Sequence, residues 1–411
     1  MPVTVLVDIS ELAVCPQAGG QGDVGLIPDA VLAWEAGRIL WAGPAQGLPS
    51  HFVYAERQSA GGRAVVPGLI DSHTHLAFAG DRTGEFTERL GGTSYLDIAR
   101  RGGGIAATVR ATRAASEQAL YDGAREVLAF MRARGVTTVE AKSGYGLDVE
   151  TELRTLRLYR RLNTEGPQRI VPTCLGAHVV PPEHRDDRAA YLRLLTDEMI
   201  PRVAREELAV FFDVFVEDTA FTPDEARALF AAARAHGLTP KLHADQLTDT
   251  GGAQLAAEVG AASADHLERI SEAGIAAMAK AGVVAGSLPI ATLALGQEPL
   301  PARALIDAGV PVAVATDLNP GSAPSPDLHL AAWLACTRQR MTPHEVLKAL
   351  SAYAARSLRL EHQIGSLEPG KVADVVVLDA SSVEAWLYDF RPGPVARTII
   401  GGETVWEKLA E

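Results

Sequence analysis

Residues 67–82 read PGLIDSHTHLAFAGDR, in which an apolar run ends in two histidines separated by a single residue. Residues i and i+2 of a β-strand point to the same face, so His73 and His75 would leave the strand end on one side. Two imidazoles placed in this way can bind one ligand. The competing interpretation is a pair of ordinary buried or surface histidines, and the rest of the sequence distinguishes between the two.

The same sequence pattern repeats from residue 67 onward: an apolar segment ends in polar residues, and a long amphipathic stretch follows it. Helix patterns cover residues 117–135 and 222–237, and the second opens on Thr222 as a candidate N-cap. Eight such apolar segments over roughly 290 residues predict an α/β fold, a TIM-like (β/α)8 barrel. The segments are 65–75, 136–146, 169–180, 210–218, 239–245, 261–268, 283–290 and 310–321.

Both ends of the chain depart from this pattern. Residues 1–66 and 365–380 contain short, β-branched apolar segments broken by glycine and proline, which predict strands. We therefore expect a small β-sandwich domain built from residues 1–66 and 360–411, and a barrel domain over residues 67–359.

The composition indicates a globular protein with a large core, because 47% of the 411 residues are hydrophobic and 22% are charged. The formal net charge of −13 argues against nucleic acid and anionic membrane surfaces as partners. The three cysteines are far apart, and no stretch approaches the ~20 apolar residues of a membrane span. We expect a cytoplasmic protein without disulfides.

Polar residues at the predicted strand ends form a candidate active site, because parallel barrel strands end on one face. Five of the eleven histidines fall there, and strand eight ends in Asp317. A single histidine at such a position is more often structural. A structural interpretation of all five would require five separate coincidences, so a joint site is favoured. The five are His73, His75, His178, His243 and His266, whereas we interpret His51, His184, His236, His329, His344 and His362 as surface residues.

The donor types suit one divalent metal ion. Imidazole and carboxylate are the ligands of zinc and ferrous sites that keep a position open for water, and both metals fit the same set. The predicted ligands are His73, His75, His243 and Asp317.

Two further features have structural as well as functional interpretations. In some binuclear barrels a carboxylated lysine on strand four bridges two metals, but here strand four ends in VFVED. Lys142 ends strand two, where a structural ion pair is at least as good an interpretation as a role in the site. The GGG at 102–104 lacks the strand–GxGxxG–helix order of a dinucleotide site and predicts a flexible loop that could act as a lid.

Several stretches resemble the amidohydrolase superfamily, above all PGLIDSHTH, the strand-end histidines and aspartate, and GSLEPGKVADVVVLD. More narrowly, HTHLAFAGDRTGEF, EAKSGYGLD, LGAHVVPPE, KLHADQL, SADHLE and ATDLNPGS are similar to the imidazolonepropionase family of histidine degradation. The resemblance runs from about residue 67 to residue 380. It implies that water opens the cyclic amide C–N bond of a small anionic substrate, 4-imidazolone-5-propanoate, to give N-formimidoyl-L-glutamate, in a homodimer.

The resemblance also implies residue roles. Asp317 would bind the metal and carry a proton from water to the leaving nitrogen, with His266 orienting the water or sharing the proton. The planar guanidinium of Arg82 would hold the propionate carboxylate with two hydrogen bonds. The other expected substrate contacts are Tyr145, His178, Gln246, Asn319, Gly321 and Ser322.

Two alternatives stand beside this interpretation. Related deaminases carry glutamate three residues after the strand-five histidine, where this chain has Gln246. Glutamine forms hydrogen bonds but cannot shuttle a proton, which argues against the first alternative, a deaminase of a small heterocycle. The second is a catalytically inactive barrel that serves as a scaffold; such proteins usually lose a metal ligand, and none is missing here.

Overall fold

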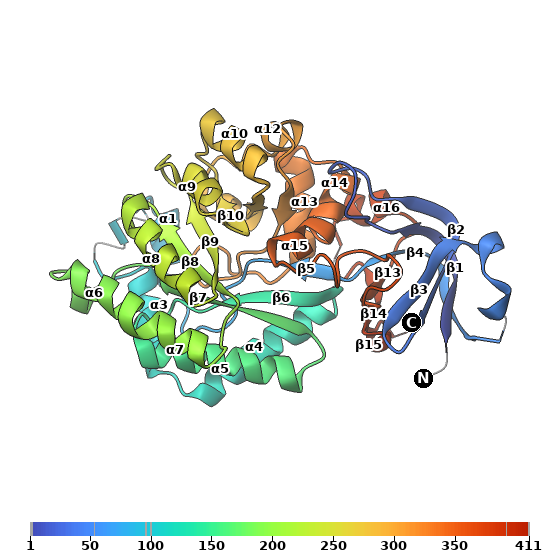
Figure 1. The fold of residues 1–411 in the computed structure, drawn as a ribbon, viewed down its shortest axis with the longest axis horizontal. Coiled ribbons are helices and arrows are strands. Elements are labelled where there is room, and N and C mark those ends of the chain that lie inside the picture. Colours follow the sequence, from blue (N-terminus) through green and yellow to red (C-terminus); the bar gives the residue numbers. More distant parts are fainter. Residues whose placement is uncertain (1–2, 53, 95–96, 99–100, 392, 410–411) are drawn as a thin grey trace.

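The computed structural model describes residues 3–52, 54–94, 97–98, 101–391 and 393–409. Two sheets organise the molecule, as Figure 1 shows. An eight-stranded barrel sheet surrounded by helices forms one end, and a seven-stranded sheet with both chain termini forms the other.

All eight predicted barrel strands are present, and they hydrogen-bond to one another in sequence order, all in parallel. Nearly every strand residue is buried, as expected for a parallel sheet covered by helices. The strands are β5 (Leu69–Asp71), β6 (Val136–Lys142), β7 (Arg169–Ala177), β8 (Phe211–Val216), β9 (Thr239–Ala244), β10 (Ser263–His266), β11 (Val284–Ser287) and β12 (Val312–Val314).

The barrel closes through the residues just beyond β5 and β12. Thr74 and Leu318 form a parallel bridge. The amide of Asp317 donates to the carbonyl of His73 at 3.0 Å, and the amide of His75 donates to the carbonyl of Leu318 at 2.8 Å. The first and last strands are therefore joined by the segments that carry three of the predicted metal ligands.

Helices cover the outside of the barrel, and their ends follow local sequence signals. Helix α8 begins after Thr222, whose side chain forms a capping box with Glu225, so the predicted N-cap is confirmed. Helix α4 buries Leu120, Leu128 and Met131 at helical spacing. The helices are α1 (Thr83–Leu90), α3 (Ile105–Ala114), α4 (Glu117–Arg132), α5 (Val149–Glu165), α6 (Arg188–Leu194), α7 (Ile200–Arg205), α8 (Pro223–Ala235), α9 (Gly252–Glu258), α10 (Glu272–Ala281), α11 (Pro289–Leu295), α12 (Ala302–Asp307), α13 (Leu328–Gln339), α14 (Pro343–Ala349), α15 (Ala352–Ser357) and α16 (Val383–Tyr388).

The strands from the two chain ends form one continuous sheet in the order β15-β14-β13-β4-β1-β2-β3. Both chain ends thus contribute to one small β domain, as expected, and its strands form a single mixed sheet with a buried cluster that includes Leu6, Leu32, Val65, Val375 and Ile399. The domain boundaries at 66/67 and 359/360 stay a prediction. The strands are β1 (Thr4–Ala13), β2 (Leu26–Glu35), β3 (Arg38–Pro44), β4 (Glu56–Pro67), β13 (Val375–Leu378), β14 (Val395–Ile400) and β15 (Glu403–Glu407).

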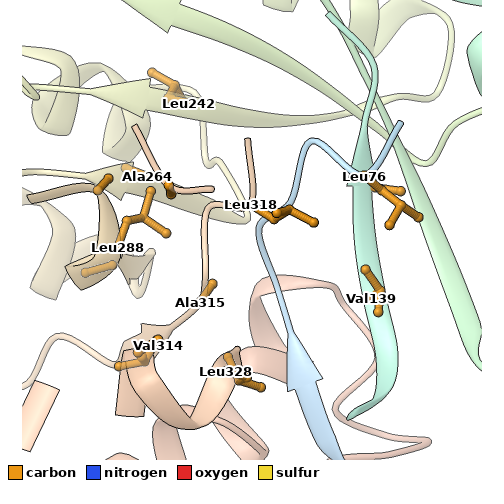
Figure 2. Close-up of a cluster of buried hydrophobic side chains, with 14 of the residues drawn as sticks. Leu76, Val139, Leu242, Ala264, Leu288, Val314, Ala315, Leu318 and Leu328 are labelled. Atoms are coloured by element: carbon orange, nitrogen blue, oxygen red, sulfur yellow. The ribbon is translucent and has the colours of Figure 1, made fainter. Parts of the chain in front are cut away.

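The main core lies between the barrel strands and the helices around them. Figure 2 shows part of this core, in which Leu76, Val139, Leu242, Leu288 and Leu328 are buried. Full burial of one such side chain stabilises the fold by about 1.5–3 kcal/mol. Across the part of the chain that the structure describes, no helix combines the length and the apolar character needed to cross a bilayer.

One histidine that we predicted at the surface, His329, is instead buried, and this prediction was wrong. His329 lies in α13 and is 5% exposed. Its Nε2 donates to the carbonyl of Trp386 at 3.0 Å, and the two rings lie 5.4 Å apart. Trp386 belongs to α16, so a segment almost sixty residues away in the sequence covers this side chain.

Candidate active site

Four predicted ligand residues converge where the barrel closes. Ligand atoms of His73, His75 and His243 lie within 4.8 Å of one another. Asp317 Oδ1 lies 3.4 Å from His73 Nε2 and 3.5 Å from His75 Nε2. His73 Nε2 and His243 Nε2 are buried without a hydrogen-bond partner among the described residues. Because buried polar atoms otherwise find partners, orphaned imidazole nitrogens beside a carboxylate fit a divalent cation.

The protonation states suit metal binding. Burial lowers the pKa of His73 and of His75 well below its usual value, which keeps both rings neutral and their lone pairs available. Burial raises the pKa of Asp317 to about 6, although His266 and His243 act to lower it. For His266, burial acts to lower the pKa, but Glu268, Asp317 and Asp265 outweigh it, and the pKa is raised.

A layer of charged side chains fills the barrel directly beneath these residues. Lys142 Nζ lies 2.7 Å from Asp213 Oδ2, 2.9 Å from Glu140 Oε1 and 3.7 Å from Asp265 Oδ2. Lys241 Nζ lies 3.1 Å from Glu140 Oε1. All five side chains are buried, so Lys142 belongs to an ion-pair network.

Two carboxylates of this layer orient the histidines above it. Asp265 Oδ2 accepts a hydrogen bond from His73 Nδ1 at 2.7 Å, and Asp213 Oδ1 accepts one from His243 Nδ1 at 3.1 Å. A proton held on Nδ1 leaves the Nε2 lone pair for a metal. Gly286 on β11 makes room for Asp265, since a Cβ at this position would lie 2.2 Å from the carboxylate oxygen.

Neither Asp213 nor Asp265 was among the site residues predicted from the sequence. A signal was present: Asp213 lies within an apolar strand and Asp265 within a short buried strand, where an unpaired charge is costly. The sequence did not reveal the partner, because the ion pairs join strands far apart in the chain.

A cleft of about 980 Å³ lies above the predicted ligands. Most of the predicted site residues line it, whereas His73 and Gly321 are not on its wall. The residues on the wall include His75, Arg82, Tyr145, His178, His243, Gln246, His266, Asp317, Asn319 and Ser322.

Arg82 lies on the cleft wall in a fixed orientation. Its Nε and Nη2 lie 2.7 and 2.6 Å from Glu85 Oε2, and its side chain is 6% exposed. Gly321 packs against the guanidinium so closely that a Cβ there would lie 2.1 Å from Nη1. The structure therefore places Gly321 as support for Arg82 rather than on the cleft wall. Glu85 also accepts a hydrogen bond from the amide of Gly104, which ties the glycine-rich loop to this group.

Buried polar groups shape the loops that carry the remaining site residues. Glu152 accepts hydrogen bonds from the amides of Gly144, Gly146 and Leu147 and so holds the loop around Tyr145. His178 Nδ1 donates to the carbonyl of Gly144 at 3.0 Å, which leaves its Nε2 as an acceptor.

The loops that carry Gln246 and Asn319 are held in the same way. Glu217 accepts from the amides of Leu247 and Thr248 beside Gln246. The amide oxygen of Asn319 accepts from the amides of Gly321 and Ser322, so this group organises its own loop.

A parallel barrel with buried imidazoles and a carboxylate at its carboxyl-terminal face is the arrangement of a metal-dependent hydrolase. The family model described as the amidohydrolase family matches residues 64–405, and the chain belongs to this family. Together, the family and the imidazole cluster support a metal cofactor.

Among curated proteins, the chain is similar to imidazolonepropionases. It is 48% identical to the Geobacillus thermodenitrificans protein over 93% of this chain and 91% of the relative. It is 50% identical to the Anaeromyxobacter dehalogenans (strain 2CP-1) protein over 93% of this chain and 92% of the relative.

Solved structures share the fold at low identity. An adenosine deaminase from Xanthomonas campestris with bound zinc matches with a TM-score of 0.72 and 18% identity over 98% of this chain and 92% of the other. A 5-methylcytosine deaminase from Klebsiella pneumoniae matches with a TM-score of 0.74 and 15% identity over 99% of each chain.

Proposed function

We propose that this chain hydrolyses 4-imidazolone-5-propanoate to N-formimidoyl-L-glutamate in histidine degradation. The observation that carries the proposal is one cleft that His75, His243, Asp317 and Arg82 all line. The similarity to imidazolonepropionases over 93% of the chain supports the same substrate. The substrate is a small heterocycle with one carboxylate, which a cleft with a fixed arginine suits.

One zinc or ferrous ion would be held by His73, His75, His243 and Asp317. The set combines neutral imidazoles with one carboxylate, which both metals accept. The metal supplies Lewis acidity, so that water can act as a nucleophile near neutral pH.

The residues around the cleft transfer the proton, orient the water and bind the substrate. The oxygen of water bonds to the ring carbonyl carbon, the C–N bond breaks, and one proton moves from the water to the leaving nitrogen. Asp317 accepts this proton from the water and passes it to the leaving nitrogen. His266 holds the water, and Arg82 binds the propionate carboxylate. Tyr145 and His178 contact the substrate's polar oxygens.

The test is loss of imidazolone propionate absorbance with purified protein, before and after treatment with a chelator. We expect turnover that the chelator abolishes and added zinc or iron restores. Asp317→Asn should abolish turnover and keep the fold. Asp374 is a buried aspartate at the junction of the two sheets, and Asp374→Asn should retain turnover. No turnover by metal-loaded protein, or release of ammonia from cytosine or guanine instead, would refute the proposal.

A further inference from the structure

Glu268, two residues beyond His266, is a buried carboxylate that the proposed reaction does not use. Its side chain is 1% exposed, and neither oxygen has a hydrogen-bond partner among the described residues. Nδ1 of His266 is also buried and without a partner in this part of the chain. The two groups lie 3.7 Å apart, Nδ1 to Oε1. Because an isolated buried carboxylate is strongly disfavoured, the imidazole is the partner that the structure offers it.

The backbone between the two residues is held in a costly conformation. His266 has φ 79° and Leu267 has φ 65°, two consecutive non-glycine residues in the left-handed region. Such residues cost on the order of 1–3 kcal/mol each and persist where the surroundings enforce them, often at functional sites. The amides of Leu267 and Arg269 donate to the carbonyls of Ala244 and Asp245, which fixes this turn against the end of β9.

The imidazole of His266 also borders the site. A ligand atom of His266 lies within 4.8 Å of ligand atoms of both His73 and Asp317, and His266 lines the cleft. The ring thus lies close both to the Glu268 carboxylate and to Asp317, the group that we propose as the proton carrier. A carboxylate behind a histidine fixes which ring nitrogen bears the proton and how the ring is oriented.

We propose that Glu268 is a positioning residue for His266: it accepts a hydrogen bond from Nδ1–H and thereby leaves Nε2 directed at the cleft. The observed separation of 3.7 Å is longer than a hydrogen bond, so the proposal requires the two groups to approach to about 2.7–3.2 Å. The catalytic consequence rests on the proposed function, since it requires His266 to hold the attacking water. The orientation and the tautomer of the ring do not depend on any substrate.

The kinetic test is a double-mutant cycle with Glu268→Gln and His266→Asn. We expect Glu268→Gln to lower kcat by roughly 10- to 100-fold, with KM and bound metal within about twofold of wild type. In the His266→Asn background the same substitution should change kcat by less than about twofold. Glu384→Gln is the matched control, because Glu384 also pairs with a histidine, His344, but at the surface (Nε2 to Oε1, 2.9 Å); it should leave kcat unchanged.

Equal losses in both backgrounds, or an unchanged kcat in Glu268→Gln, would overturn the proposal. A second measurement holds even if His266→Asn is too slow to assay, or if the protein acts on another substrate. Imidazole ¹⁵N NMR, with the His266 signals identified by their loss in His266→Asn, should show the proton on Nδ1 in wild type and an altered pattern in Glu268→Gln. Identical His266 signals in the two proteins would overturn the proposal independently of the proposed function.

Discussion

Asp265→Asn tests whether the charged layer under the site orients the metal-binding histidines. Asp265 Oδ2 lies 2.7 Å from His73 Nδ1 and 3.7 Å from Lys142 Nζ. If the asparagine NH₂ group faces His73, the ring must move its proton to Nε2 and loses the lone pair that a metal needs. If the amide oxygen takes the Oδ2 position, it still accepts from His73 Nδ1–H, but the negative charge that faces both His73 and the Lys142 ammonium is lost. Loss of such a partner weakens metal affinity about 10- to 100-fold, or about 1.4–2.8 kcal/mol.

The assay is a zinc titration of metal-free protein against a competing chromogenic chelator. Asp374→Asn is the matched control, because Asp374 is 3% exposed and is paired with Arg169 at 3.1 Å, away from the cleft. We expect the control to bind zinc as wild type does, and both metal-free variants to unfold in one cooperative transition. A dissociation constant of Asp265→Asn within twofold of wild type would refute the role that we assign to this carboxylate.

Four further substitutions test other parts of the structure. Arg82→Met should raise KM by roughly 10- to 1000-fold, because it removes the fixed cation on the cleft wall; steady-state kinetics with an unchanged KM would mean that the propionate binds elsewhere. Gly286→Ala should weaken zinc binding, because its Cβ would lie 2.2 Å from a carboxylate oxygen of Asp265. Gly123→Ala adds its methyl group to α4 where there is open space, and it should raise the free energy of unfolding in urea by about 0.5–1 kcal/mol. Burial lowers the pKa of His329, so as the pH falls below about 6.5 the unfolded chain binds a proton that the folded protein disfavours, and stability is lost. The thermal midpoint should therefore drop less between pH 7.5 and pH 5.5 in His329→Gln than in wild type, and an equal drop would contradict this assignment.

The barrel could be predicted because its signal is local. Each strand is a short apolar run and each helix a stretch of regular apolar spacing, so neighbours in the chain suffice to recognise them. The same reasoning located Thr222 as a helix N-cap. It could not show that β4 pairs with β13, some three hundred residues later, to make one continuous sheet. Strand pairing between chain ends depends on the tertiary fold and leaves little trace in either segment.

The candidate site shows the same division. His73, His75, His243 and Asp317 were predictable as a group, because parallel strands present their last residues on a single face. The packing of Gly321 against the Arg82 guanidinium was not predictable, because this contact joins two loops more than two hundred residues apart.

The sequence by itself determined the strand and helix segments, the polar residues at the strand ends and the donor types that suit a divalent metal. Only the tertiary structure decided which charges meet inside the barrel: Lys142 with Asp213 and Glu140, and Asp265 with His73. The physical reason is that hydrophobic periodicity is set by adjacent residues, whereas a buried charge is stabilised by whichever opposite charge the fold brings within about 4 Å. That second property belongs to the assembled barrel rather than to any one segment.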